Sequence, residues 1–133
     1  MSERLRFQIV APERVVVASD ADAVTVPGAL GALGILPGHA ALVAQLRIGE
    51  VRWRLGGREH AAVVTGGFVE VGEGIVTVLA DSAELPAEID LEAARGAIVE
   101  AEEHLRSAGG DEADAWLATL ALATTRIAVA SRS

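Results

Sequence analysis

At Val24–Leu42 the chain reads VTVPGALGALGILPGHAAL, in which glycine and proline cut the apolar residues into short pieces. Proline supplies no amide hydrogen and glycine permits a positive φ, so no helix fits this stretch. We expect tight loops between short strands, with positive φ available at each glycine from Gly28 to Gly38. The apolar residues between them enter a core or form an exposed docking patch; they are Leu30, Leu33, Ile35 and Leu36.

Around this stretch, from Leu5 to Leu85, apolar and polar residues alternate with a period of two, which predicts half-buried strands. Turn signals recur about every 8–12 residues, a spacing typical of a sandwich or barrel. We place turns at Ala11–Glu13, Ser19–Asp20, Gly56–Gly57, Gly66–Gly67 and Gly72–Gly74, besides the glycine stretch itself. Residues 1–86 are therefore predicted to form an antiparallel β-sandwich.

The pattern changes at Glu84–Glu88, where a proline lies among acidic residues, and we place the domain boundary there. Residues 87–133 then show the three- and four-residue spacing of amphipathic helices. Asp90 can cap the first helix, and Gly109-Gly110 can end it. The first apolar stripe comprises Leu91, Ala94, Ile98, Ala101 and Leu105, and the second Trp116, Leu120, Ala123 and Ile127. The sequence predicts an antiparallel two-helix hairpin, so the fold is mainly β with an α-helical appendage.

The second helix is apolar on more than one face, because Leu117, Leu122 and Val129 lie off the Trp116 stripe. Isolated helices of this length are marginal in water, so the pair must pack against itself, the sandwich or a partner. An excess of apolar surface suits a helix that can change what it packs against.

The composition argues against several classes of function. A formal charge of −8 disfavours a nucleic-acid partner, and the absence of lysine and cysteine removes lysine and thiolate chemistry. The histidines, His39, His60 and His104, lack the short spacing of a metal site, and we predict neither a metal nor a catalytic group. No unbroken apolar run approaches the roughly 20 residues that span a bilayer, and we expect neither a signal peptide nor an anchor.

Several motifs together resemble the epsilon subunit of the bacterial F-type ATP synthase. They are Val26-Pro27-Gly28, Gly31, Gly34–Ala40, Leu42, Leu46–Gly49, Val64–Val71 and Val76–Asp81, and they cover most of the chain. The resemblance implies a non-catalytic subunit of the rotor, in which the sandwich binds the gamma shaft subunit and the c-ring. Such a subunit couples ion-driven rotation to ATP synthesis, and it is peripheral to the cytoplasmic face of the plasma membrane, held there only through the complex.

Within that family the glycine-rich region faces the c-ring, which implies partner contacts by Leu30, Gly31, Ala32, Leu33 and His39. The family often has an acidic residue where this chain has Ala32, so we expect docking to depend on apolar contact through Leu30 and Leu33. For His39 we favour a hydrogen bond within its own loop over a contact to a neighbouring subunit.

The resemblance also implies that the helical hairpin can fold on the sandwich or extend to the alpha/beta catalytic head and inhibit ATP hydrolysis. The residues implied are Trp116, Leu117, Leu120, Leu122 and Arg126, with apolar bulk dominating charge. Members that bind ATP share a motif of which Ile89, Asp90 and Ala94 remain here. Ala93 replaces its arginine, so we predict weak or absent ATP binding and no cofactor.

The competing interpretation is a free-standing β-sandwich, a binding module or small-ligand enzyme with the hairpin as a dimerisation arm. A protein anchored on a lipid surface is disfavoured by the acidic charge and the lack of a basic amphipathic helix.

Overall fold

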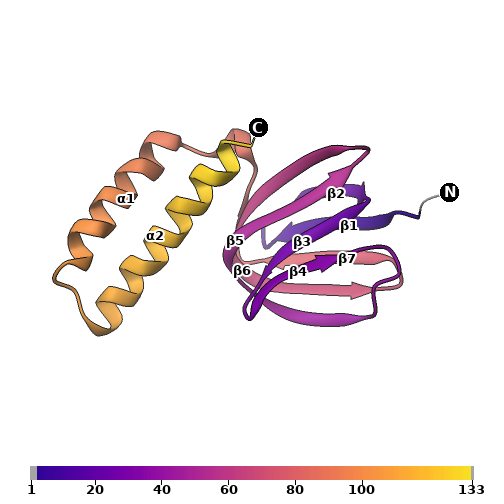
Figure 1. Cartoon of the computed structure of the whole chain (residues 1–133), viewed down its shortest axis with the longest axis horizontal. Coiled ribbons are helices and arrows are strands. Elements are labelled where there is room, and N and C mark those ends of the chain that lie inside the picture. The colour runs from indigo at the N-terminus through magenta and orange to yellow at the C-terminus, as the bar shows by residue number, and fades with distance from the viewer. Residues whose placement is uncertain (1–2, 133) are drawn as a thin grey trace.

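The computed structural model describes residues 3–132 and places a β domain before a helical hairpin (Figure 1). The strands are β1 Leu5–Ala11, β2 Arg14–Ala21, β3 Ala23–Gly28, β4 Gly31–Ile35, β5 Leu42–Leu55, β6 Arg58–Gly72, β7 Ile75–Ala80 and β8 Ala83–Glu84. A short 3-10 helix, η1 Pro86–Glu88, leads to α1 Leu91–Leu105 and α2 Gly110–Ala130. The predicted sandwich and two-helix hairpin are confirmed.

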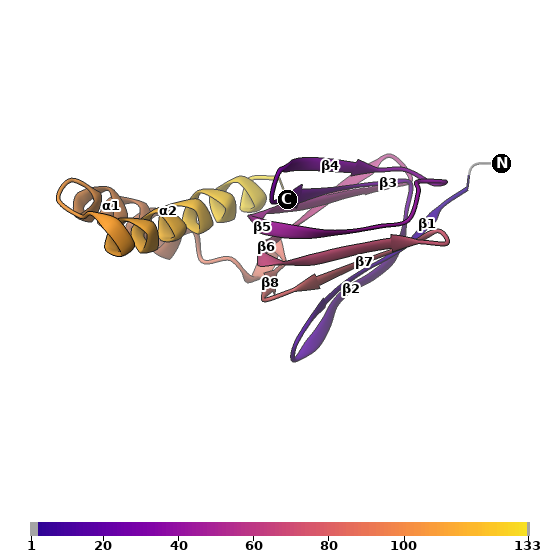
Figure 2. The ribbon, with the colours of Figure 1, turned by 90° about the horizontal axis from the view of Figure 1, so that it is seen from below.

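The strands pair in the order β2-β1-β7-β6-β5-β3-β4, with β8 beside β6. Figure 2 shows β3 and β4 above β7 and β2, with the long strands β5 and β6 joining the two layers. The prediction of a wholly antiparallel sandwich is wrong at one place, because β1 and β7 run parallel. Alternation of apolar residues reports which face a side chain occupies, and it carries no information on strand direction.

Two predicted turns lie inside strands. Ser19–Asp20 belongs to β2, and Gly66–Gly67 belongs to β6, where the backbone has φ values of 122° and 125°. A Cβ at Gly67 would lie 2.0 Å from the carbonyl oxygen of Leu79, so the glycine permits close approach of the neighbouring strand. In the glycine stretch only Gly31 and Gly38 have positive φ, which corrects the expectation for Gly28 and Gly34.

The main core fills the space between the two layers. Phe7 and Trp53 meet there with ring centroids 5.1 Å apart, surrounded by buried valines, isoleucines and alanines. Within residues 3–132 no polar or charged residue is buried, so this core is held by apolar packing alone. A core of this kind gives the β domain a stiff body.

The helices begin near the predicted residues. Asp90 caps α1, since its Oδ1 accepts a hydrogen bond from the amide of Ala93 at 3.0 Å. Helix α2 begins at Gly110, so this glycine opens the second helix and does not end the first. Figure 1 shows α2 between α1 and the sheet, which makes α2 the helix that attaches the hairpin to the sandwich.

Helix α2 is 21 residues long with a mean hydropathy of 1.2, so by length and composition alone it could cross a membrane. The prediction that no segment approaches this limit was based on unbroken apolar runs, and α2 reaches it through its many alanines. Its apolar residues contact α1 and the sheet, which accounts for part of this composition.

Candidate docking surfaces and hairpin junction

The loop between β3 and β4 presents Leu30 to solvent with a relative exposure of 105%. Its backbone is fixed on both sides: Gly28 pairs with Gly31, and the amide of Ala29 donates to the carbonyl of Gln45 at 2.8 Å. A Cβ at Gly28 would lie 2.5 Å from the carbonyl oxygen of Gly31, so this close turn requires glycine. A large apolar side chain on a fixed loop is suited to docking.

A shallow hollow of about 540 Å³ lies beside Leu30, lined by Gly28–Leu33 and Val43–Gln45. Ala32 is exposed in it, while Leu33 is half-buried and packs against the main core. Leu33 is therefore less available for docking than the sequence suggested, and the apolar contact falls mainly to Leu30.

His39 lies apart from these residues, because strand β4 separates the Leu30 loop from the loop that contains His39. Its Nδ1 donates to the carbonyl oxygen of Ala40 at 2.7 Å, a contact within its own loop. The structure thus divides the predicted partner-contact set between the two ends of β4.

A second exposed apolar surface crosses the outer face of the sheet, and we call it the outer row. It consists of Val15, Val10, Leu79 and Phe68, which are cross-strand neighbours on β2, β1, β7 and β6. Phe68 is 49% exposed and Val15 57%, and residues that pair directly share a face of the sheet. This surface could not be predicted from the sequence, because alternation alone does not say that four outward-facing positions become adjacent.

Helix α2 attaches to the sandwich through a small apolar cluster. Val129 is fully buried against Ala61 and Val63 of β6, with Ile89 and Leu122 at its edge. The sequence carried a signal for this contact that we missed. Ala61–Val64 is an unbroken apolar run, and such a run marks a strand covered on both faces.

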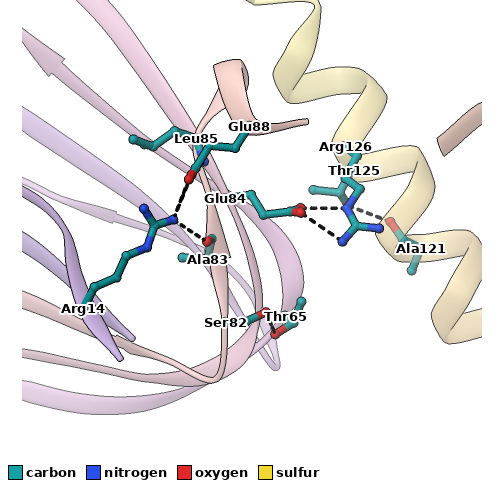
Figure 3. A network of polar contacts seen from close by, with 10 residues as sticks. All are labelled: Arg14, Thr65, Ser82, Ala83, Glu84, Leu85, Glu88, Ala121, Thr125 and Arg126. Carbon is teal, nitrogen blue, oxygen red and sulfur yellow. Dashed lines mark hydrogen bonds and ion pairs between the residues drawn. The ribbon is translucent and has the colours of Figure 1, made fainter. Parts of the chain in front are cut away.

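Ion pairs flank this cluster. Arg126 makes a bidentate contact to Glu84, with Nε to Oε1 at 2.7 Å and Nη2 to Oε2 at 3.1 Å (Figure 3). Farther along, Nε of Arg132 lies 2.6 Å from Oε2 of Glu50, and this hydrogen bond raises the pKa of Arg132. All four side chains keep contact with water, so salt and competing charges can reach both pairs.

Hydrogen bonds tie the linker η1 to the sandwich, and η1 also lies against α2. Glu88 accepts hydrogen bonds from Nη2 of Arg14 at 2.8 and 2.9 Å and from the amide of Leu85 at 2.9 Å (Figure 3). The Arg14 guanidinium and then the Leu85 amide lower the pKa of Glu88. Arg14 and Glu88 are far apart in sequence, so the contact braces the linker against β2.

The residues expected to act in regulation are distributed over α2. Leu122 and Arg126 contact the sandwich, Leu120 is half-buried, and Leu117 is 51% exposed. Trp116 stacks on His104 of α1 with ring centroids 4.2 Å apart and an interplanar angle of 3°. The sandwich thus already contacts part of the surface that the hairpin would offer to another partner.

The remnant of the ATP motif has structural roles in this conformation. Ile89 packs at the α2 junction, Asp90 caps α1, and Ala94 is buried. Ala93 is exposed and offers no cation at the position where the resemblance implies an arginine for ATP binding. Within residues 3–132 no cluster of three or more His, Asp or Glu side chains could hold a metal ion.

The comparisons with known proteins place these features in a family. Residues 4–86 match the family described as "ATP synthase, Delta/Epsilon chain, beta-sandwich domain". The ATP synthase epsilon chain of Desulforamulus reducens is 45% identical over 122 residues, covering 92% of each chain. That of Halalkalibacterium halodurans is 45% identical over 130 residues, covering 96% of this chain and 98% of the relative.

Solved structures show the same fold. A chain of the mitochondrial ATP synthase of Euglena gracilis, in an assembly containing OSCP, F1 and the c-ring, matches with a TM-score of 0.83 at 24% identity. The match covers 94% of this chain and 80% of that one. A chain of the Tetrahymena thermophila central stalk and c-ring matches with a TM-score of 0.62 at 15% identity, covering 96% and 98%.

Proposed function

The chain belongs to the family of ATP synthase epsilon chains, and from that premise we propose that it is a rotor subunit that couples the turning ring to the turning shaft. The observation that carries the proposal is that relatives of this name match over nearly their whole length, hairpin included. A free-standing module with an unrelated helical arm would match through the sandwich alone. The full-length matches therefore favour the rotor subunit over that alternative.

We assign the Leu30 loop to the c-ring. Leu30 is fully exposed on a backbone held by paired glycines, and a hollow lies beside it. The loop has no charged side chain, so contact to the ring depends on apolar burial and shape. A rigid loop loses little conformational entropy on docking, which favours transmission of torque.

We assign the outer row to the gamma subunit. Phe68, Leu79 and Val15 remain exposed on a stiff sheet, and aromatic residues such as Phe68 are enriched where stable interfaces form. The Leu30 loop lies between strands β3 and β4, whereas the outer row crosses β2, β1, β7 and β6. Two separate surfaces allow one body to hold shaft and ring together.

We further propose that the chain is itself non-catalytic and that it is peripheral to the cytoplasmic face of the plasma membrane through the complex. Its ion pairs and apolar packing hold the hairpin on the sandwich, which is a structural role. Membership of the family supports the location at the membrane through the complex. The hairpin, if extended to the alpha/beta head, would offer Leu117 and Trp116 as apolar contacts. With Ala93 in place of arginine, we propose that ATP does not stabilise the folded hairpin appreciably.

Co-purification with gamma and the c-ring tests the assignment. The tagged chain should recover both, Leu30→Asp should lose the ring about ten-fold or more, and Phe68→Asp should lose gamma by a similar factor. Val99→Asp is the matched control, because Val99 is 63% exposed on α1 and should leave both contacts intact. Recovery of neither partner by the parent chain would contradict the proposal.

A crosslink and a truncation test the ring contact and the role of the hairpin separately. The chain has no cysteine, so Ala32→Cys introduces a single thiol that should crosslink to a thiol in the ring loop. Truncation after Glu88 keeps the braced linker and removes the hairpin. Faster ATP hydrolysis by the complex after truncation would support inhibition by the hairpin, and an unchanged rate would remove regulation from the function.

A further inference from the structure

The free end of the hairpin carries a stacked pair of rings, and one of the two, a histidine, can change charge. His104 lies in the last turn of α1 and stacks on Trp116 of α2 at 4.2 Å and 3°. The sheet holds the opposite end of the hairpin, where α2 meets Ala61 and Glu84. The stack therefore bridges the two helices at the end that the sandwich contacts least.

His104 is also part of the turn that ends α1. Its carbonyl oxygen accepts hydrogen bonds from the amides of Ser107 at 3.2 Å and Ala108 at 3.0 Å. Any opening of the tip that separates the helices also disturbs this turn. His104 is an exposed residue, so protons from solvent reach it.

Charge on the imidazole strengthens this arrangement in two ways. A cation over the face of tryptophan is attracted by the ring quadrupole, and a cation in the last turn of a helix is favoured by the helix dipole. Histidine is the side chain that ordinarily changes charge between pH 5 and 8. A neutral imidazole keeps the ring contact and loses both electrostatic contributions.

The charged residues that neighbour His104 and Trp116 along the two helices are mostly acidic. Near His104 in α1 they are Glu100, Glu102, Glu103 and Arg106, and near Trp116 in α2 they are Asp111, Glu112 and Asp114. Glu100 precedes His104 by one helical turn, and Glu112 precedes Trp116 by one, so both lie on the side of the stack.

We propose that the His104–Trp116 stack is a pH-sensitive clasp, which closes the tip of the hairpin when His104 is protonated and loosens it when His104 is neutral. The direction of the pH dependence follows because the charged imidazole is the stabilised form. Closure is therefore strongest at acid pH and declines as the pH rises. The clasp does not depend on the assignment to the ATP synthase rotor. Its regulatory meaning, that acid conditions oppose separation of the two helices, does rest on the proposed function.

Tryptophan emission of the isolated full chain tests the clasp. Contact with a protonated imidazole quenches indole emission, so lowering the pH from 8 to 5 should dim Trp116. Trp53 stacks on His60 with ring centroids 5.6 Å apart and also responds. Subtracting the titration of His104→Gln from that of the parent chain removes this second pair, and a flat difference curve would overturn the proposal.

Amide hydrogen exchange supplies the second readout. At each pH the exchange rates of residues 102–118 are compared between the parent chain and His104→Gln, so the intrinsic pH dependence of exchange cancels. Protection of the parent should exceed that of the variant by about two- to five-fold at pH 5.5 and converge towards it at pH 8. A ratio that does not change with pH would overturn the clasp.

The variant His104→Phe separates charge from packing. It keeps an aromatic ring against Trp116 but cannot be protonated. The protection of its hairpin tip should therefore equal that of the parent only at high pH, and fall below it at low pH. If stacking alone mattered, His104→Phe would match the parent at every pH, and the proposal would fail. Both readouts use the chain without its partners, so failure of the rotor assignment would leave them unaffected.

Discussion

The interior of the sandwich and the junction of α2 with β6 are built in different ways. The interior packs Phe7, Trp53 and many branched side chains, with no polar residue buried within residues 3–132. The junction buries one small cluster around Val129 and adds ion pairs that remain in contact with water. The first arrangement is that of a stiff body, and the second, with few contacts that are open to competition, is the arrangement expected of a segment that opens locally.

The largest expected effect is in the interior. Phe7→Ala should lower the free energy of unfolding of the sandwich by about 3–5 kcal/mol, because the site cannot collapse around a large cavity. Denaturant unfolding followed by Trp53 emission measures the change. Val15→Ala is the control, since Val15 is 57% exposed and should change stability by less than about 0.5 kcal/mol. Similar losses for both variants would contradict a single core between the layers.

A smaller and local effect is expected at the junction. Val129→Ala removes two buried methyl groups and should weaken docking of the hairpin by about 1.5–2 kcal/mol. Hydrogen exchange of α2 should accelerate while the melting temperature of the sandwich remains unchanged. Leu117→Ala is the matched control, because Leu117 lies on the same helix with 51% exposure. If Val129→Ala lowered the sandwich transition as much as α2 protection, junction and interior would form one cooperative unit.

The interior could be predicted from the sequence because its signal is local. Alternation at Leu5, Phe7 and Ile9 identified inward positions of β1, and all three are buried. The parallel pairing of β1 with β7 could not be predicted, because two strands far apart in the chain present the same alternation in either direction. The turn predicted at Gly66–Gly67 failed for a related reason: glycine permits close approach inside a strand as well as a turn.

The junction was harder to predict than the interior. Arg126 was singled out for an extended hairpin, but its partner Glu84 lies 42 positions away, and Arg132 finds Glu50 across 82 positions. Charged residues carry no periodic signal that identifies such partners. Among the docking residues, the sequence left open whether Leu30 is in the core or exposed. The turn fixed by pairing of Gly28 with Gly31 leaves Leu30 exposed.

The ion pairs at the junction should contribute less free energy than the apolar cluster around Val129. A double-mutant cycle of Arg126→Gln and Glu84→Gln should give a coupling of about 0.5–1 kcal/mol for hairpin docking, because the pair is bidentate but partly solvated. The coupling should shrink as salt is raised. Arg126→Lys tests the geometry, since lysine cannot make the two parallel contacts and should lose part of the coupling. A coupling that is insensitive to salt would indicate that the pair contributes through packing.

The smallest expected effect concerns the brace between Arg14 and the linker. The Arg14 guanidinium and the Leu85 amide hold the pKa of Glu88 below its ordinary value of 4.5. A carboxyl whose pKa is lowered on folding stabilises the folded state above its unfolded pKa, and this stabilisation is lost as the pH falls through the folded pKa. Glu88→Gln should therefore lower the melting temperature slightly at pH 7, and the difference from the parent should vanish as the pH falls through the lowered pKa of Glu88.

Glu88 also tells whether the linker moves with the sandwich or with the hairpin. If it belongs to the sandwich, the melting difference between the parent and Glu88→Gln should persist after truncation behind residue 88, because Arg14 and Leu85 both remain. Glu70→Gln on β6 serves as the control, since Glu70 is exposed and the structure shows no ion pair for it among residues 3–132. Loss of the pH-dependent difference on truncation would mean that the hairpin positions Glu88. The releasable segment would then begin before Pro86 rather than after the brace.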